Sequence, residues 1–249
     1  MRRSRTHAVA DGLLGLVLEG TYPPTSALPS EADLAARFGV SRLTVREAIR
    51  SLASTNVIEV RHGKSSVINP PELWSPLDPR LLQARGEVSG QPDVLPRKLI
   101  EARRTIEIGV AELAARRRTD EQLHRLAQYL DVMRHAHALA DVPRFVEADL
   151  GFHDTLFAIA DNLFLDAVFE PLAEVMRTLR ITTSSLDEHR QHAIDWHDRI
   201  LAAVADGNPD EAREAMRAHL VQTEGDSDEF LTDHPGPSDE PTNPSPTAA

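Results

Sequence analysis

Apolar residues recur every three or four positions through the C-terminal half of the chain, the spacing that places them on one face of a helix. Few Gly or Pro residues interrupt this pattern, and no strand-like alternation occurs there. The pattern predicts six helices, over residues 94–116, 120–138, 142–161, 163–183, 188–206 and 209–223. Amphipathic helices with short connections are typical of an all-α helical bundle.

The first part of the chain shows a different pattern, of three short helices followed by two strand-like runs. The helices are predicted over residues 6–19, 31–38 and from Ser41 to about Ser54. Ser30 and Ser41 fit as N-caps, and Gly39 ends the middle helix. Two short helices joined by a turn that contains Gly are the helix-turn-helix signature. The runs at 57–60 and 66–68 predict a β-hairpin wing with a basic tip.

Proline-rich and polar stretches divide the chain into parts. Residues 69–79 contain four prolines and cannot continue a helix, so they begin a linker. The C-terminal stretch is rich in Pro, Ser, Asp and Thr and poor in large apolar residues, which is typical of disorder. The predicted organisation is a mainly α chain: a winged helix-turn-helix domain over 1–70, a linker over 71–93, an all-α domain over 94–224 and a disordered acidic tail over 225–249.

The composition narrows the chemistry that the 249 residues can carry. The absence of cysteine excludes disulfides, Cys-ligated zinc, iron–sulfur clusters and thiol nucleophiles. No apolar run approaches the roughly 18 residues of a membrane helix, and no signal peptide is evident, so we expect a cytoplasmic protein. The net charge of −12 hides a basic region, because residues 1–70 carry nine Lys/Arg against six Asp/Glu. Such a region can bind an anion.

Basic residues gather on the second helix of the helix-turn-helix. Arg42, Arg46 and Arg50 follow one another at i, i+4 and i+8, opposite Val45 and Ile49. A row of guanidinium groups suits phosphates and guanine edges in the DNA major groove. A solvated basic face on an ordinary helix is the alternative, which the helix caps and the basic hairpin tip weaken. The predicted DNA-binding residues are Ser41, Arg42, Thr44, Arg46, Arg50, His62, Gly63 and Lys64.

In the helical domain, polar residues occupy positions where core residues are expected. Asp149 stands on the apolar stripe of its helix with His153 one turn later, and such a pair can chelate one ion. His197, His219 and Arg103 lie on the stripes of three other helices. Because buried charges are costly unless paired or metal-bound, these residues indicate a polar site in the bundle. An Asp–His–His–His set without thiolate suits a divalent metal, with zinc first and nickel, manganese, iron and cobalt as alternatives.

A less specific interpretation of these histidines stays open. A single histidine on an apolar stripe is more often a core residue with satisfied hydrogen bonds. The domain also offers other histidines that could be mistaken for ligands: His124, His135, His137, His189 and His192. Spacing along the sequence does not show that the ligand-bearing helices meet.

The N-terminal motifs resemble those of GntR-family bacterial transcription regulators. The resemblance rests on Leu28-Pro29-Ser30-Glu31, Gly39-Val40-Ser41-Arg42, Thr44-Val45-Arg46-Glu47-Ala48-Ile49 and the His62-Gly63 wing. It implies a winged-helix fold over roughly residues 6–70, with Arg42 and Arg46 contacting DNA and the wing tip entering the minor groove. The chain departs from the family at Ala32, where an Arg is usual, so one expected DNA contact is missing.

The helical domain resembles the FCD ligand-binding domain of the FadR-like GntR subfamily, over about residues 95–222. The resemblance rests on Glu101-Ala102-Arg103, Glu107, Leu113-Ala114-Ala115, Asp149, Phe152-His153, Asn162, His197 and Met216 with His219. Members with this pattern bind a divalent metal in the bundle and a small carboxylate effector beside it. The resemblance therefore implies the metal ligands Asp149, His153, His197 and His219, and the effector-binding residues Arg103 and Asn162.

The function expected from these patterns is a homodimeric transcription regulator, with repression as its expected action. It would bind an approximately palindromic operator in double-stranded DNA and respond to a small organic acid, such as a sugar acid. The competing hypothesis is a metal-dependent hydrolase or other metalloenzyme that uses the Asp/His site. No His-Glu-x-x-His motif accompanies that site, and an enzyme would leave the DNA-binding domain unexplained. A third interpretation makes the metal purely structural.

Overall fold

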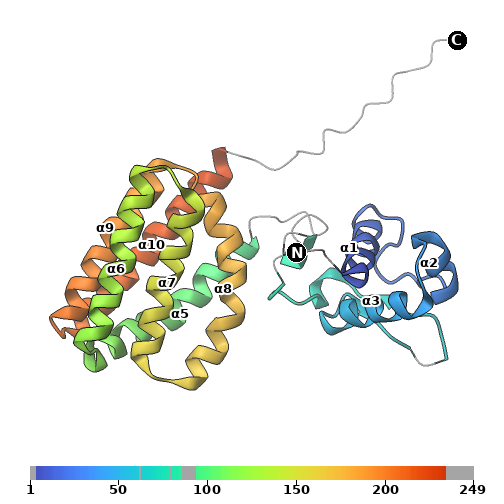
Figure 1. The fold of residues 1–249 in the computed structure, drawn as a ribbon, viewed down its shortest axis with the longest axis horizontal. Coiled ribbons are helices and arrows are strands. Elements are labelled where there is room, and N and C mark those ends of the chain that lie inside the picture. Colours follow the sequence, from blue (N-terminus) through green and yellow to red (C-terminus); the bar gives the residue numbers. More distant parts are fainter. Residues whose placement is uncertain (1–3, 62, 79, 83, 86–93, 234–249) are drawn as a thin grey trace, which may run out of the picture. The chain divides into compact units, whose positions relative to one another are not determined.

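The computed structural model describes residues 4–61, 63–78, 80–82, 84–85 and 94–233 (Figure 1). These residues divide into two compact units, an N-terminal one and a C-terminal helical one. Over the described ranges the only sheet has two strands. The predicted mainly α class, a winged helix-turn-helix followed by an all-α bundle, is confirmed. None of the described helices is both long and apolar enough to cross a membrane.

The N-terminal unit forms the predicted helix-turn-helix and wing. Its elements are α1 (Arg5–Leu18), α2 (Glu31–Phe38), α3 (Arg42–Ser54), β1 (Ile58–Glu59) and β2 (Val67–Ile68). Ser30 caps α2 by accepting from the Asp33 amide at 3.2 Å, and Ser41 caps α3. Gly39 ends α2 in the left-handed conformation, with φ of 63°, where glycine avoids the strain of a Cβ atom. The turn between the two helices therefore follows from three residues at fixed spacing.

The N-terminal unit extends beyond the predicted boundary at residue 70. Pro71–Leu73 forms a short 3₁₀ helix, and Trp74 behind it is 1% exposed. The indole Nε1 of Trp74 donates a hydrogen bond to the Asn69 carbonyl oxygen at 2.9 Å. Leu81 and Ala84 also join the core of this unit. The first part of the expected linker is thus folded, because its apolar side chains pack on the winged helix; residues 86–93 lie outside the described residues.

The six predicted helices follow (Figure 1). They are α5 (Val94–Arg117), α6 (Asp120–Ala138), α7 (Val142–Ala160), α8 (Leu163–Thr183), α9 (Asp187–Ala205) and α10 (Pro209–Asp233). These helices make up the C-terminal unit, except that residues 94–95 of α5 and 167–178 of α8 are grouped with the N-terminal unit. α6 packs against α7 and α9, and α9 packs against α10. Thr119 and Gln122 form a capping box at the start of α6. The connections between successive helices are short, so neighbouring helices lie antiparallel. Their inward faces therefore surround one interior.

The buried face of α5 is not centred on all of its large apolar residues. Leu99, Ile106 and Leu113 lie at helical spacing from Arg103 but are only half-buried. The buried residues are instead Ile100, Arg103, Glu107, Val110, Ala111, Ala114 and Ala115. This face brings a second charged residue, Glu107, into the interior beside Arg103.

The predicted disordered tail is wrong for residues 225–233, because α10 continues through them to Asp233. Asp226 and Ser227 are 7% and 5% exposed. The Gln222 side-chain amide donates to Asp226 Oδ1 at 2.9 Å, and Arg97 pairs with Asp228 at 2.8 Å. These contacts satisfy acidic residues that composition alone assigns to a disordered tail. The rest of that tail, residues 234–249, lies outside the described residues.

Candidate metal centre and DNA-binding surface

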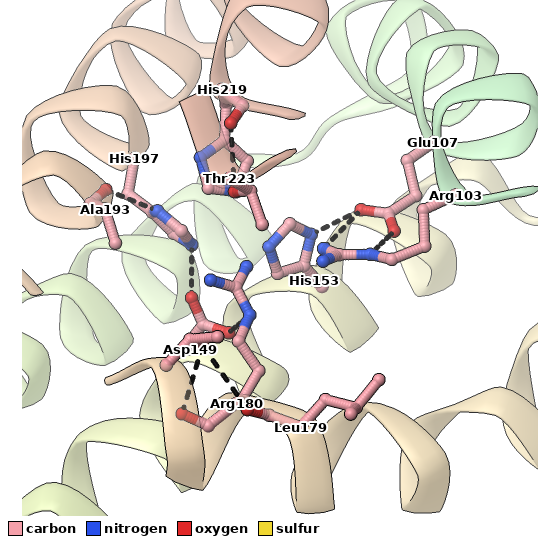
Figure 2. Close-up of polar contacts among 11 residues, drawn as sticks. Arg103, Glu107, Asp149, His153, Leu179, Arg180, Ala193, His197, His219 and Thr223 are labelled. Carbon is pink, nitrogen blue, oxygen red and sulfur yellow. Dashed lines mark hydrogen bonds and ion pairs between the residues drawn. The ribbon is translucent and has the colours of Figure 1, made fainter. Parts of the chain in front are cut away.

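Three histidines from three helices converge in the interior of the C-terminal unit (Figure 2). His153 of α7, His197 of α9 and His219 of α10 are each at most 1% exposed. One ring nitrogen of each lies within 4.8 Å of those of the other two. The ring centroids are 4.8 to 5.5 Å apart. The predicted histidines are therefore close enough to share one ion.

Asp149 lies beside this cluster. It precedes His153 by one turn on the buried stripe of α7, as the sequence predicts. Its Oδ1 is 3.3 Å from Nε2 of His197. The structure thus places Asp149 beside the three-histidine group, in contact with His197.

The protonation geometry of His197 bears on whether a cation fits here. Its Nδ1 lies 2.6 Å from the Ala193 carbonyl oxygen, which can only accept, so Nδ1 carries the proton. The neutral ring then directs the lone pair of Nε2 toward the Asp149 carboxylate. Two acceptors facing each other are unfavourable unless a cation lies between them. A backbone carbonyl that fixes the tautomer in this way is a usual feature of metal-bound histidines.

Buried polar atoms without hydrogen bonds lead to the same interpretation. Within the described part of the chain, the Nε2 atoms of His153, His197 and His219 are buried and lack a hydrogen-bond partner. Both carboxylate oxygens of Asp149 also lack a partner in hydrogen-bond geometry. Such groups are rare in folded proteins, since each forfeits its hydration. The donor set fits a divalent metal that accepts nitrogen and oxygen ligands.

A buried chain of charged groups positions His153 from the opposite side. Arg103 Nε donates to Glu107 Oε1 at 2.5 Å, and Glu107 Oε2 lies 2.7 Å from His153 Nδ1 (Figure 2). Arg103 and Glu107 are one turn apart on α5 and almost fully buried. Arg103 is thus already paired with a carboxylate of this chain, which sequence reasoning did not anticipate.

Arg180 of α8 is a second residue that sequence reasoning missed. Its Nε lies 3.2 Å from Asp149 Oδ2, and it is 8% exposed. Arg180 follows buried Met176 by one turn, so it also stands on an apolar stripe. The signal that identified Asp149, a charged residue at a core position, could have identified Arg180 too.

Burial and charge set the protonation states of these groups. Burial lowers the pKa of His197 to about 3 and that of His219 well below its ordinary value. Burial opposes ionisation of Glu107, but Arg103 and His153 outweigh it, so its pKa lies well below the ordinary range. Arg180 likewise outweighs burial and lowers the pKa of Asp149. At neutral pH His197 and His219 are therefore neutral and Asp149 and Glu107 are ionised, which are the forms of these groups that bind metals.

Asn162 has a structural role at the start of α8, and the expected effector contact stays a prediction. Its side-chain oxygen accepts from the Phe164 amide at 3.1 Å, so Asn162 caps α8. Asp161 before it ends α7 in the left-handed conformation, with φ of 47°. This turn accounts for the position of Asn162 by local hydrogen bonding.

The arginine row on α3 is exposed. Arg42, Arg46 and Arg50 share the solvent face of the helix. The opposite face buries Val45, Ala48, Ile49 and Leu52. Ser41 and Thr44 join their hydroxyl groups at 2.9 Å at the start of the helix, beside Arg42. The helix can therefore present its arginines without disturbing the core.

Two of these arginines are paired with acidic residues of the chain. Arg46 makes a bidentate contact with Glu31 at the start of α2, at 2.9 and 2.7 Å. Arg50 pairs with Glu47 at 2.8 Å. Since the Arg46 side chain is 52% exposed, a DNA phosphate or base can replace Glu31 as its partner.

The wing has the predicted antiparallel form, with Ile58 opposite Ile68. Gly63 at its tip has φ of 71°, a conformation that favours glycine, and Lys64 beside it is exposed. The predicted contact His62 lies outside the described residues. The described part of the tip is therefore basic and accessible.

Family models match both parts of the chain. The model for bacterial regulatory proteins of the gntR family matches residues 5–68, and the FCD domain model matches residues 98–222. The chain is 34% identical over 217 residues to the HTH-type transcriptional regulator LutR of Bacillus subtilis, covering 84% of this chain and 94% of LutR. It is 28% identical over 221 residues to the HTH-type transcriptional repressor NanR of Cronobacter sakazakii, covering 88% and 84%.

A solved structure adds evidence on the fold. Lar, which controls the expression of the Listeria monocytogenes agr system, matches with a TM-score of 0.66 at 18% identity, over 92% of this chain and 99% of Lar. The metalloenzyme hypothesis is set aside, because the family and the named relatives are regulators. The chain belongs to the gntR family of bacterial regulatory proteins, as a transcription regulator with an FCD domain.

Proposed function

We propose that the chain is a repressor whose operator affinity is controlled by a small organic acid bound at a metal centre in the FCD domain. The convergence of three buried imidazoles with free Nε2 atoms supports this proposal most strongly. The name of NanR as a repressor supports repression as the direction of control. The regulator would act in the cytoplasm, where it meets DNA.

The metal would be held by Asp149, His153, His197 and His219. Zinc suits this set first, and nickel, manganese, iron and cobalt accept the same ligands. When bound, the metal supplies positive charge and a coordination position for a carboxylate. The Ala193 carbonyl oxygen orients His197, and Glu107 orients His153.

The effector would be a small carboxylate, because two guanidinium groups lie beside the metal ligands. Arg103 and Arg180 both reach this interior. A guanidinium suits a carboxylate through two parallel N–H groups. Arg103 would exchange or share its contact with Glu107 to bind the effector, so effector binding would alter the position of α5.

The DNA-binding form would be a homodimer on an approximately palindromic operator. One α3 helix reads only a few base pairs, and a two-fold protein matches two-fold DNA. α3 would enter the major groove with Arg42, Arg46 and Arg50, while Ser41 and Thr44 contact phosphates. The wing would use His62, Gly63 and Lys64 in the minor groove.

A purely structural metal is the second candidate, and one observation favours it. Arg103 already has Glu107 as a partner, so the cation needs no bound anion. In that case the metal would stabilise the bundle without responding to organic acids.

Three variants separate these roles. Metal content would be measured in purified full-length protein, followed by operator binding with and without a panel of organic acids. His197→Ala should lose metal and effector response together, whereas Arg103→Ala should keep metal and lose only the response. The exposed His135→Ala is the matched control and should change neither. Full metal content in His197→Ala would contradict the metal centre; a normal response in Arg103→Ala would leave the structural metal as the remaining candidate.

A further inference from the structure

A second cluster of metal-ligating side chains lies between α9 and α10, outside the centre described above. His189 Nε2 is 3.9 Å from Asp226 Oδ1 and 3.8 Å from Glu229 Oε2. The three ligand atoms all lie within 4.8 Å of one another. Asp226 and Glu229 lie beyond residue 222, where the match to the FCD family model ends. The cluster thus depends on the part of α10 that extends past the family's domain.

The orientation of His189 is fixed by the backbone. Its Nδ1 lies 3.0 Å from the Thr183 carbonyl oxygen, so Nδ1 carries the proton and donates it. Because Nδ1 is engaged in this hydrogen bond, Nε2 is the ring nitrogen that faces the two carboxylates. His189 is 7% exposed, so water solvates it poorly. Two carboxylates gathered beside one buried ring nitrogen call for a positive charge among them.

Asp226 is held in place by neighbours on both helices. Gln222 Nε2 lies 2.9 Å from its Oδ1, and His192 Nδ1 lies 3.1 Å from the same atom. Asp226 is 7% exposed, whereas the Glu229 side chain is 65% exposed. A carboxylate oriented by donors, beside a second carboxylate that can close from solvent, is a suitable arrangement for ion entry.

Other charged groups lie near this cluster. Arg180 lines a small cavity of about 10 Å³ together with Asp226, His189 and His219. Its ion pair is with Asp149, and its charge also acts on Asp226. Glu188 is 3.8 Å from His192 Nε2 and adds negative charge.

The distances favour a metal ion over a shared proton. A protonated His189 would hydrogen-bond to a carboxylate at about 2.7–3.2 Å, which is shorter than the two distances found here. Nitrogen and oxygen ligands about 2.0–2.2 Å from one ion lie roughly 3–4 Å from each other. The observed spacing is therefore that of ligands around one ion.

We propose that His189, Asp226 and Glu229 form a second divalent-cation site, which joins α9 to the extension of α10. Two carboxylates and one imidazole suit manganese, zinc or cobalt, with water in the remaining coordination positions. Because Glu229 is exposed, this site exchanges its ion more readily than the three-histidine centre does. Its ion also fixes one wall of the cavity that His219 and Arg180 line.

The test uses full-length protein freed of metal and titrated with Zn²⁺ and, separately, with Mn²⁺ at neutral pH. We expect two equivalents of Zn²⁺ per chain, the weaker of which is lost in Glu229→Gln and in Asp226→Asn. The substitution at exposed Glu229 should leave the fold intact, as checked by circular dichroism. The matched control is Glu214→Gln, an exposed carboxylate on the same helix, which should keep both equivalents.

The outcomes distinguish this site from the three-histidine centre. His197→Ala should lose the tighter equivalent and keep the weaker one. If wild type, Glu229→Gln and Asp226→Asn bind the same number of ions with the same affinities, the second site is refuted. That result would leave the three-histidine centre unaffected, whereas unchanged binding by His197→Ala would refute the centre alone.

Discussion

Asp149 Oδ2 lies 3.2 Å from Arg180 Nε, and both side chains are buried in the helical unit. Removing one member of a buried ion pair leaves the other as an uncompensated charge. We therefore expect Asp149→Ala to lower the free energy of unfolding of the metal-free protein by about 3–5 kcal/mol. The measurement is urea unfolding in the presence of a chelator, which excludes any effect of metal.

The matched control for this prediction is an exposed pair of the same chemistry. Asp198 pairs with Arg134 on the surface, where the Asp198 side chain is 48% exposed. Because solvent screens such pairs, Asp198→Ala should cost about 0–1 kcal/mol. Similar losses in the two variants would show that the buried pair is no more than a packing contact.

The stability of the metal-free protein should fall as the pH is lowered from about 6.5 toward 3. Burial lowers the pKa of His197 from 6.5 to about 3, so between these values the unfolded chain binds a proton that the folded chain does not. Stability from such a group is complete above the unfolded pKa and is lost at about 1.4 kcal/mol per pH unit within the window. His219 acts in the same direction, and Glu107 adds to the loss below its unfolded pKa.

The pH dependence is tested by urea unfolding at pH 7, 6 and 5. His197→Leu removes the titrating group. The change of the unfolding free energy with pH should therefore become smaller by the amount that one bound proton accounts for. His135→Ala, at an exposed position, should leave it as in wild type. An unchanged slope in His197→Leu would mean that the imidazole is protonated in the folded protein.

The helix boundaries could be predicted because local chemistry specifies them. Ser30 and Ser41 cap their helices through their own hydroxyl groups, and Gly39 takes a left-handed conformation that other residues adopt only with strain. The inward position of Asp149 and His153 also follows from helical periodicity alone. These features depend on residues within one or two helical turns of each other, so their spacing can be read directly from the sequence.

The unpredicted features depend on partners distant in the sequence. Glu107 of α5 meets His153 of α7, and Arg180 of α8 meets Asp149, so neither pair has a fixed spacing. By composition alone, the acidic residues after Gly225 are typical of a disordered tail. In the folded chain, however, His192 of α9 lies within hydrogen-bond distance of Asp226. Tertiary contacts of this kind determine whether such a segment folds, because they give its charged side chains partners that the segment itself does not contain.

Arg46 is expected to carry DNA affinity, and Glu31 to oppose it. Arg46→Ala should weaken operator binding roughly tenfold to a hundredfold, the range for losing one bidentate contact. Glu31 holds the same guanidinium in the free protein, so Glu31→Gln should release it and strengthen binding. Mobility-shift titrations at one fixed salt concentration measure both effects.

The control for the DNA surface is Arg217→Ala, an exposed arginine of α10 that pairs with Glu214. It should leave operator binding unchanged. Unaltered binding by Arg46→Ala would remove this residue from the DNA-binding surface. Weaker binding by Glu31→Gln would show instead that Glu31 positions Arg46 for DNA.

The extension of α10, which the sequence predicted as part of a disordered tail, should stabilise the helical unit. Truncation after Glu224 removes buried Asp226, which accepts from Gln222 and contacts His192, and it also removes the pair between Arg97 and Asp228. Hydrogen bonds to a charged group contribute about 1.5–3 kcal/mol, and each kcal/mol shifts Tm by about 2–4 °C in a protein of this size. The truncated protein should therefore melt several degrees lower, measured in chelator so that no metal contributes.

Truncation after Asp233 is the matched comparison, because it removes only residues 234–249. That segment has few large apolar side chains to bury, so its loss should leave Tm unchanged. The Asp226→Asn variant of the full chain then separates the effect on Tm of losing the Asp226 charge from the effect of shortening α10. It should recover part of the loss caused by truncation after Glu224, since the helix and buried Ser227 remain. Equal Tm values for the truncation after Glu224 and the truncation after Asp233 would show that the extension contributes nothing to stability.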